Sequence, residues 1–184
     1  MRAAKAVIET PRLLLRPWVD RDLAAAAALY GDPEVMRFIG TGEPLTLQAT
    51  AAALDRWSRH EAEHGFTLWA AVERATGELV GDCGLIHLDG GPEIEVGYRL
   101  RRDRWGRGYA TEAARACVAH GFGPLGLDRI CGVTHPGNVA SQRVLAKCGM
   151  TDLGIAFYYG QTVRYFAVER QAPPGSGPLR PDGA

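Results

Sequence analysis

A stretch of the chain around Gly106 and Gly108 has the residue types that could bind phosphate. Small and apolar residues recur at helical spacing directly after it, which predicts a helix over residues 108–122. The first turn of a helix has backbone N–H groups without internal partners, and the helix dipole makes that end positive. Two glycines at the entrance permit a tight turn and leave these groups uncovered. The segment therefore predicts a backbone socket for the oxygens of a pyrophosphate.

Two widespread phosphate-binding motifs do not match this segment. A P-loop would place Lys and then Ser or Thr after its last glycine, whereas Tyr109-Ala110 follows Gly108. A dinucleotide fingerprint would need a third small residue and a direct turn from strand to helix, and the arginine-rich loop at residues 101–104 argues against it. Many helices also follow Gly-X-Gly only because the chain turns there. The rest of the sequence has to decide between these interpretations.

The segments on either side of the socket carry the other polar candidates. Residues 93–100 alternate polar and apolar, which predicts a strand with Glu93 and Glu95 on one face. Gly97 inside it indicates a β-bulge or a close approach of the backbone to a neighbour. Asn138 is placed to cap a helix that ends at Gly149. Both helices follow strands, so their N-termini could lie near the same edge of a sheet.

The remaining elements must position these candidates. Periodicity, proline and glycine predict further helices at 21–30 (with Asp20 as its N-cap), 34–38 and 46–63, and further strands at 12–18, 66–73, 78–88, 128–134, 151–158 and 162–168. Early helices, a meander of strands and then alternating strands and helices predict a single mixed-sheet α/β or α+β domain. We expect this domain to span residues 1–171 and the Pro/Gly-rich residues 172–184 to form a flexible tail.

Composition narrows the class of protein. The chain has 184 residues, 46% of them hydrophobic, and 21 basic residues balance 21 acidic ones. A formal net charge of zero gives no reason to expect nucleic acid or an anionic membrane as a partner. No apolar stretch approaches the length of a membrane span, and the N-terminus lacks a secretory signal. These features favour a cytoplasmic globular protein.

The cysteines and histidines suggest no metal site. Cys83, Cys117, Cys131 and Cys148 show no C-x-x-C spacing, so we expect free, buried thiols in a reducing compartment. His60 and His64 have the i, i+4 spacing that metal sites use, but the sequence offers no evident third ligand. The prediction for these two histidines is a solvated helix end.

Four blocks occur in a fixed order: Glu-Ile-Glu-Val-Gly-Tyr at 93–98, Trp-Gly-Arg-Gly-Tyr-Ala-Thr-Glu-Ala at 105–113, Asn-Val-Ala-Ser at 138–141 and Lys-Cys-Gly-Met at 147–150. This ordered set, within a match over about residues 10–170, resembles the GNAT superfamily of acyl-CoA-dependent N-acetyltransferases. It is most similar to the Rim-type subgroup, typified by ribosomal-protein N-terminal acetyltransferases. The superfamily's pyrophosphate signature usually begins with Gln or Arg. Here Trp105 stands at that place, which is familiar in the Rim-type subgroup.

The resemblance implies a fold and an acetyl-CoA site. The fold is α+β, with a central mixed, mostly antiparallel twisted sheet of about seven strands, about four flanking helices and a splayed strand pair at the acyl-CoA cleft. Backbone amides of the socket would hold the CoA pyrophosphate, and the strand after Glu95 would pair with the pantetheine arm. A bulge at Gly97 would open the cleft. The implied CoA contacts are Val96, Tyr98, Leu100, Trp105, Gly106, Arg107, Gly108, Tyr109, Ala110, Thr111, Asn138 and Ser141.

Transfer of an acetyl group from a thioester to an amine needs a base for the ammonium, a donor for the developing oxyanion and an acid for the thiolate. Glu95 and Glu93 are the candidate bases. Glu95 is favoured because it lies beside the suspected bulge and matches the acidic position of the Rim-type pattern, acting directly or through a water. A backbone N–H of residues 96–98 is the expected oxyanion donor.

For the thiolate, Ser141 is the candidate acid, and Asn138 would orient the CoA arm in addition to capping its helix. Tyr158 and Tyr159 are rival acids, although a place in a hairpin favours packing roles. Cys148 is disfavoured as a nucleophile because no histidine lies near it in sequence.

The sequence thus predicts an enzyme that moves an acetyl group from acetyl-CoA to a primary amine, by direct attack in a ternary complex and without a metal. The amine could be a protein N-terminus, an antibiotic, a polyamine or an amino acid, and the protein could be a monomer or a homodimer. A non-catalytic acyl-CoA sensor of the same fold is the alternative. A nucleotide-binding domain is a third interpretation.

Overall fold

A computed structural model describes residues 8–171, so the predicted tail at 172–184 lies outside the described residues. One eight-stranded sheet, in the order β1-β2-β3-β4-β5-β6-β8-β7, forms the centre of the molecule. All neighbouring strands are antiparallel except β5 and β6, which are parallel. The strands are β1 (Ile8–Glu9), β2 (Leu13–Arg16), β3 (Leu68–Glu73), β4 (Leu79–His87), β5 (Ile94–Leu100), β6 (Arg129–Thr134), β7 (Thr151–Tyr158) and β8 (Gln161–Glu169).

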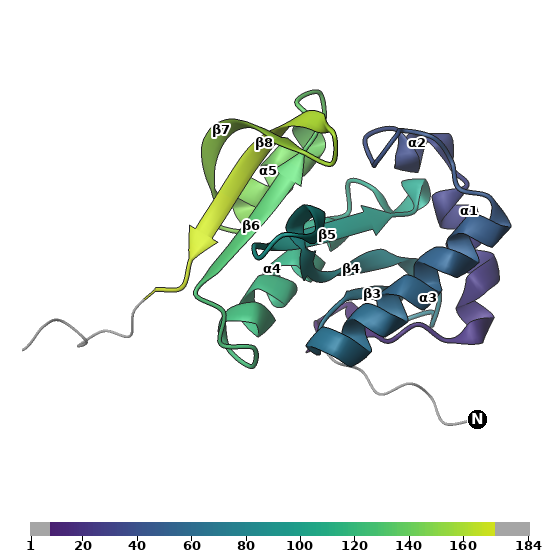
Figure 1. Ribbon diagram of the computed structural model, residues 1–184. Coiled ribbons are helices and arrows are strands. Elements are labelled where there is room, and N and C mark those ends of the chain that lie inside the picture. The colour runs from purple at the N-terminus through teal and green to yellow at the C-terminus, as the bar shows by residue number, and fades with distance from the viewer. Residues whose placement is uncertain (1–7, 172–184) are drawn as a thin grey trace, which may run out of the picture.

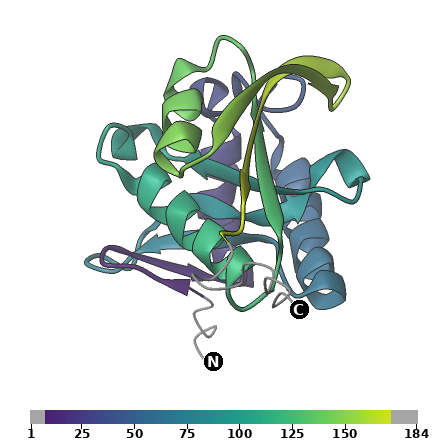
Figure 2. The ribbon, with the colours of Figure 1, turned by 90° about the vertical axis from the view of Figure 1, so that its left-hand side faces the viewer.

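Helices cover both faces of the sheet, with α4 and α5 on one side and α3 on the other (Figures 1 and 2). The α-helices are α1 (Leu23–Tyr30), α2 (Pro33–Met36), α3 (Leu47–His64), α4 (Tyr109–Phe122) and α5 (Val139–Lys147). Short 3-10 helices occupy Asp20–Asp22, Leu88–Gly90 and Arg102–Arg104. None of the helices in the described part of the chain is long and apolar enough to cross a membrane.

The observed elements agree with the predicted α+β architecture and differ in two details. The two-residue strand β1 brings the sheet to eight strands within residues 8–171, whereas the short helix predicted at 34–38 is present as α2. Asp20 does not cap α1, because a 3-10 turn begins at this residue. Asp22 stands at the N-cap position instead, and its carboxylate accepts hydrogen bonds from Arg16 and from the backbone N–H of Val19.

The predicted bulge at Gly97 is wrong, although the splayed strand pair is present. β4 and β5 pair in continuous register from Gly81 opposite Leu100 to His87 opposite Ile94. Gly97 instead allows a close approach, since a Cβ atom there would lie 3.2 Å from Leu68 Cδ2. β5 and β6 pair only where Glu95 faces Cys131. β5 stays paired with β4, and β6 stays paired with β8. β5 and β6 therefore diverge from each other beyond this point (Figure 1).

Alternate residues of β5 serve the two faces of the sheet. Val96, Tyr98 and Leu100 pack into the main hydrophobic cluster, which includes Ala113 and Cys117 of α4. Arg99 points to the opposite face, where its guanidinium lies over the rings of residues 30 and 57 and pairs with the buried carboxylate of residue 82. Because side chains alternate along a strand, Glu95 and Arg99 share the face covered by α1 and α3.

Candidate active site

The predicted phosphate socket has the expected backbone conformation. Gly106 and Gly108 have φ values of +73° and +81°, in the left-handed region that favours glycine. Gly108 is the N-cap residue of α4, and among the described residues no side chain caps this helix end. In contrast, Thr46 caps α3 and Asn138 caps α5 through side-chain oxygens. The first-turn N–H groups of α4 are therefore available to an external anion.

The side chains of the socket take distinct positions around this backbone. Residues 106–108 are exposed, whereas Ala110 and Thr111 are partly buried in the first turn. The indole N–H of Trp105 donates to the carbonyl of Leu100 at 2.7 Å, while 48% of the residue remains exposed. The Tyr109 side chain is buried and turned inward. Tyr109 could therefore contribute its backbone to a bound pyrophosphate, but its ring stabilises the protein interior.

Arg12, in the β1–β2 turn, contacts the socket through its guanidinium. Its guanidinium donates to the carbonyl of Arg107 at 2.9 Å and to the Glu112 carboxylate at 2.6 Å, and it lies 4.4 Å from the Tyr109 ring centroid. A Cβ atom on Gly108 would stand 3.5 Å from the same guanidinium. Sequence reasoning missed Arg12, because about a hundred residues separate it from its partners and no local pattern connects them.

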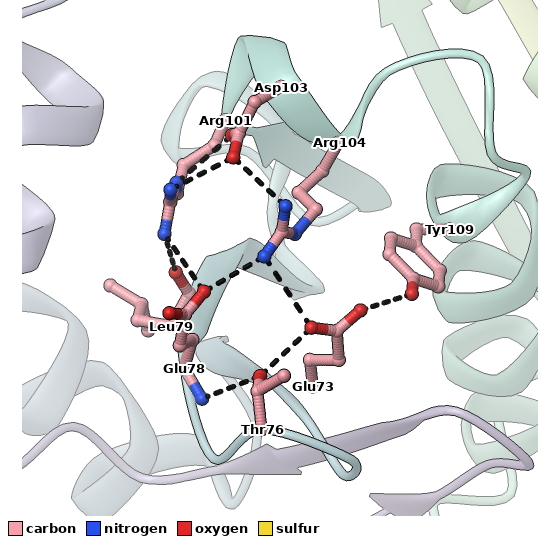
Figure 3. Close-up of polar contacts among 8 residues, drawn as sticks. All are labelled: Glu73, Thr76, Glu78, Leu79, Arg101, Asp103, Arg104 and Tyr109. Atoms are coloured by element: carbon pink, nitrogen blue, oxygen red, sulfur yellow. Dashed lines mark hydrogen bonds and ion pairs between the residues drawn. The ribbon is translucent and has the colours of Figure 1, made fainter.

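A buried carboxylate on β3 fastens both ends of the socket loop. Glu73 accepts a hydrogen bond from the Tyr109 hydroxyl at the start of α4 and lies 3.5 Å from Arg104 Nη2 before the loop. Arg104 also pairs with Glu78 at 2.8 Å, and Thr76 donates to Glu73 at 2.8 Å (Figure 3). The hydrogen bond from Tyr109 is the main cause of the lowered pKa of Glu73. Through Glu73, the sheet thereby positions Arg104 before the socket loop and Tyr109 at the start of α4.

Glu95 lies at the point where β5 and β6 diverge. Only 6% of the residue is exposed, and its carboxylate accepts a hydrogen bond from the Tyr159 hydroxyl of the β7–β8 turn. Burial raises the pKa of Glu95 to about 7, against the lowering effects of the Tyr159 hydrogen bond and of Arg99. A carboxyl group with this pKa can take up and release a proton near neutral pH.

Glu93 differs from Glu95 in position and in protonation. It precedes β5 by one residue, so only Glu95 belongs to the strand itself. Its carboxylate accepts hydrogen bonds from Tyr158, at 2.8 Å, and from Tyr165. The Tyr165 hydrogen bond is the main cause of the lowered pKa of Glu93. Glu93 is therefore a stably ionised carboxylate that binds the β7–β8 hairpin through two tyrosines, which makes it a poor proton acceptor.

A second polar group lies on the α4 side of β5. The hydroxyls of Tyr98 and Ser141 are 2.9 Å apart, and Tyr98 also donates to the Ser141 carbonyl at 3.1 Å. Asn138 Oδ1 accepts a hydrogen bond from the Ser141 N–H at 3.1 Å, which confirms the predicted cap of α5. Tyr98 entered the sequence prediction as a strand residue beside the pantetheine. Its hydroxyl contact with Ser141 depends on the packing of α5 and could not be found from sequence.

A surface cleft lies on the face of the sheet that Glu95 shares with its cross-strand neighbour Ile86, opposite Tyr98. Two of its lining residues adjoin Glu95: Tyr159 through its hydroxyl and Ile86 as the cross-strand neighbour on β4. Gln161 donates to the Gly40 carbonyl at 3.5 Å, so the loop after α2 reaches the β7–β8 turn near this cleft. The cleft is lined by Arg56, Trp57, His60, His64, Ile86, His87, Gly90, Gly91, Pro92 and Tyr159.

The buried state of Glu95 has a consequence for stability. We expect Glu95→Gln to raise the free energy of unfolding at pH 8 by up to about 3 kcal/mol, since a pKa of about 7 instead of 4.5 disfavours the folded carboxylate. Below about pH 4.5 the carboxyl is neutral in both the folded and the unfolded protein. The gain in stability should therefore shrink as the pH falls from about 7 to about 4.5. Urea unfolding of both proteins at about pH 8 and pH 5 measures it. A variant less stable than wild type at pH 8 would contradict the pKa.

Comparison with known proteins agrees with this fold. Residues 12–151 match the model of the acetyltransferase (GNAT) domain. Protein YkkB of Bacillus subtilis is 36% identical over 165 residues, covering 88% of this chain and 90% of its own. The FsC-acetyl coenzyme A-N(2)-transacetylase of Aspergillus fumigatus is 34% identical, covering 84% of this chain and 68% of its own.

Among solved structures, Mycobacterium smegmatis RimJ in complex with CoA-disulfide superimposes with a TM-score of 0.71, at 24% identity, covering 85% of this chain and 81% of its own. This likeness extends the Rim-type resemblance to the fold. The sheet and these matches define an acyl-CoA-dependent transferase. The chain belongs to the GNAT family of N-acetyltransferases.

Proposed function

We propose that this enzyme transfers an acetyl group from acetyl-CoA to a primary amine by direct attack within a ternary complex. The observation that carries the proposal is the arrangement at the splay of β5 and β6. Glu95, with a pKa near neutrality, lies on one face of the sheet, and the Tyr98–Ser141 pair lies on the other. Two substrates could thus approach from opposite faces and meet where the strands part.

On one face, the residues present fit acetyl-CoA. The uncapped start of α4 would hold the pyrophosphate through its N–H groups and dipole. The edge of β5 beyond Glu95 has no paired strand among the described residues, so an extended pantetheine could add to it. The Ser141 hydroxyl, which lies beside the Tyr98 hydroxyl, would then protonate the leaving thiolate. The Tyr98 hydroxyl would be a second proton donor next to it.

On the other face, Glu95 would take the proton that the attacking ammonium must lose. Its burial favours proton uptake, and the Tyr159 hydroxyl holds the carboxylate in place. Burial and the Glu95 carboxylate raise the pKa of Tyr159, so this tyrosine serves better as a positioning donor than as a proton source for catalysis. A backbone N–H of residues 96–98 would stabilise the oxyanion.

The acceptor amine would enter through the cleft beside Tyr159. Half of the residues that line the cleft carry aromatic rings, and Arg56 is the one lysine or arginine among them. Such walls suit an amine presented on an extended chain, so a protein N-terminus is our first candidate acceptor, in keeping with the Rim-type likeness. A small-molecule amine is the second candidate, and the printed name of the Aspergillus relative supports acetyl transfer from coenzyme A to a nitrogen atom.

A screen of peptides and small amines that measures release of free CoA tests the proposed function. We expect acceptor-dependent CoA release with at least one primary amine, and the acetylated amine should appear by mass spectrometry. Acetyl-CoA binding without turnover across a broad panel would contradict catalysis and favour a binding protein of the same fold.

Direct transfer makes Cys148 dispensable. Burial is the main cause that raises the pKa of the Cys148 thiol to about 11, the opposite of what a nucleophilic cysteine needs. We expect Cys148→Ala to keep kcat within about twofold of wild type and initial-rate plots to intersect, as sequential kinetics require. Parallel lines in these plots, or an acetyl-cysteine found by mass spectrometry, would show an acyl-enzyme instead.

A further inference from the structure

Three histidines from distant segments meet at the mouth of the cleft. His60 and His64 occupy successive turns near the end of α3, and His87 ends β4. One ring nitrogen from each lies within 4.8 Å of the others. His64 lies exposed at the end of α3, as expected, but the sheet supplies a third imidazole beside the pair that sequence spacing could not reveal.

The hydrogen bonds of His60 set the state of its ring. Its Nδ1 lies 2.7 Å from the carbonyl of Phe66. A carbonyl oxygen only accepts, so Nδ1 carries the proton and Nε2 keeps a lone pair. This Nε2 faces His87 Nδ1 at 3.1 Å. Histidine ligands in metal sites characteristically donate their second ring N–H to a backbone carbonyl, which fixes the tautomer and the ring orientation.

The other two rings are suited to complete a ligand set. The ring centroids of His64 lie 4.6 Å from those of His60 and 4.5 Å from those of His87, and the ring planes are inclined by 58° and 64°. His64 is exposed, and its Nε2 is 3.8 Å from a Glu63 oxygen, too far for a hydrogen bond. The His64 ring can therefore turn toward the other two imidazoles without breaking this contact as a hydrogen bond.

From these contacts we propose that His60, His64 and His87 bind one Zn²⁺ ion or a chemically similar divalent transition metal. Imidazole nitrogens suit such ions. With Zn–N bonds of about 2.0–2.1 Å, tetrahedral ligands stand roughly 3.3–3.4 Å apart, close to the 3.1 Å between His60 and His87. Three protein ligands leave the fourth position open to the cleft, which also contains Tyr159. The site would tie the end of α3 to the end of β4 beside the acceptor entrance.

Metal titration of the tag-free protein, without acetyl-CoA, tests this site. We expect isothermal calorimetry with Zn²⁺ to give one ion per chain and Co²⁺ to give the visible absorption of a four-coordinate complex. His64→Gln and His87→Gln should each weaken binding by about tenfold or more, since even loss of a supporting contact around a metal costs about 10–100-fold. His120→Gln is the matched control, because His120 lies against Trp69 and outside the cluster.

The outcomes are distinct. Stoichiometric binding that both cluster variants lose and His120→Gln keeps would establish the site. No binding by the wild-type protein, or equal binding by wild type and both cluster variants, would overturn it. The measurement involves no acetyl transfer, so its failure would leave the proposed function intact, and a failed amine screen would leave the metal site intact.

Discussion

Replacing Glu95 by Gln is expected to lower kcat by about 10²–10⁴-fold, the usual contribution of a general base, with little change in the affinity for acetyl-CoA. The substitution keeps the shape of the side chain and its ability to accept the Tyr159 hydrogen bond. It removes the group that takes the proton. Steady-state kinetics with an acceptor found in the screen, together with calorimetric binding of acetyl-CoA, separate these two effects.

The pH profile gives this prediction its sharpest form. Glu95 works only as the carboxylate, so wild-type kcat should rise as pH increases through a midpoint near its pKa of about 7. The Glu95→Gln variant should not show this rise of kcat with a midpoint near pH 7. Its activity should recover partly at high pH, where the free amine no longer needs a base. A wild-type profile flat between about pH 5 and 9 would show that proton removal by Glu95 does not limit turnover.

Glu93→Gln is the matched control for the same chemistry two residues away. The Glu93 carboxylate anchors Tyr158 and Tyr165, so its loss should act on stability while kcat stays within a few-fold of wild type. If the two variants exchanged their behaviour, Glu93 would be the base. If both were silent, solvent or another group would remove the proton.

Gly108→Val should weaken acetyl-CoA binding by roughly 1.5–3 kcal/mol for each charge-assisted hydrogen bond that the socket loses. Gly108 has φ +81°, which a β-branched residue adopts only with strain, and it caps α4 at the position where pyrophosphate oxygens would meet the backbone. A valine side chain would both shift the first turn and cover its N–H groups. Calorimetric titration with acetyl-CoA measures the change, and an unchanged dissociation constant would contradict the socket.

Gly126→Val separates backbone strain from loss of the socket. Gly126, in the loop after α4, has φ +65°, and a Cβ atom there meets nothing within 4 Å. Both variants should lose similar stability on thermal unfolding, since each forces valine into the same region of backbone space. Only Gly108→Val should weaken acetyl-CoA binding.

Local patterns in the sequence determined most of the elements. α4 was predicted at 108–122 and observed at Tyr109–Phe122, because small apolar residues at helical spacing have one buried face to satisfy. The caps of α3 and α5 were equally readable, since Thr46 and Asn138 bond to N–H groups only three residues away. Such short-range interactions depend little on the rest of the fold. The uncapped glycine start of α4 followed from the same kind of local chemistry.

Contacts between distant segments were decided only by the tertiary structure. The pKa of Glu95 depends on burial at the splay and on Tyr159, 64 residues away. The splay itself arises because β5 and β6 follow different antiparallel neighbours, and Gly97 only mimicked the signal of a bulge. His87 joins His60 and His64 because β4 ends beside the last turns of α3. Sequence periodicity reports which face of an element is buried, whereas the packing of whole elements determines which side chains meet there.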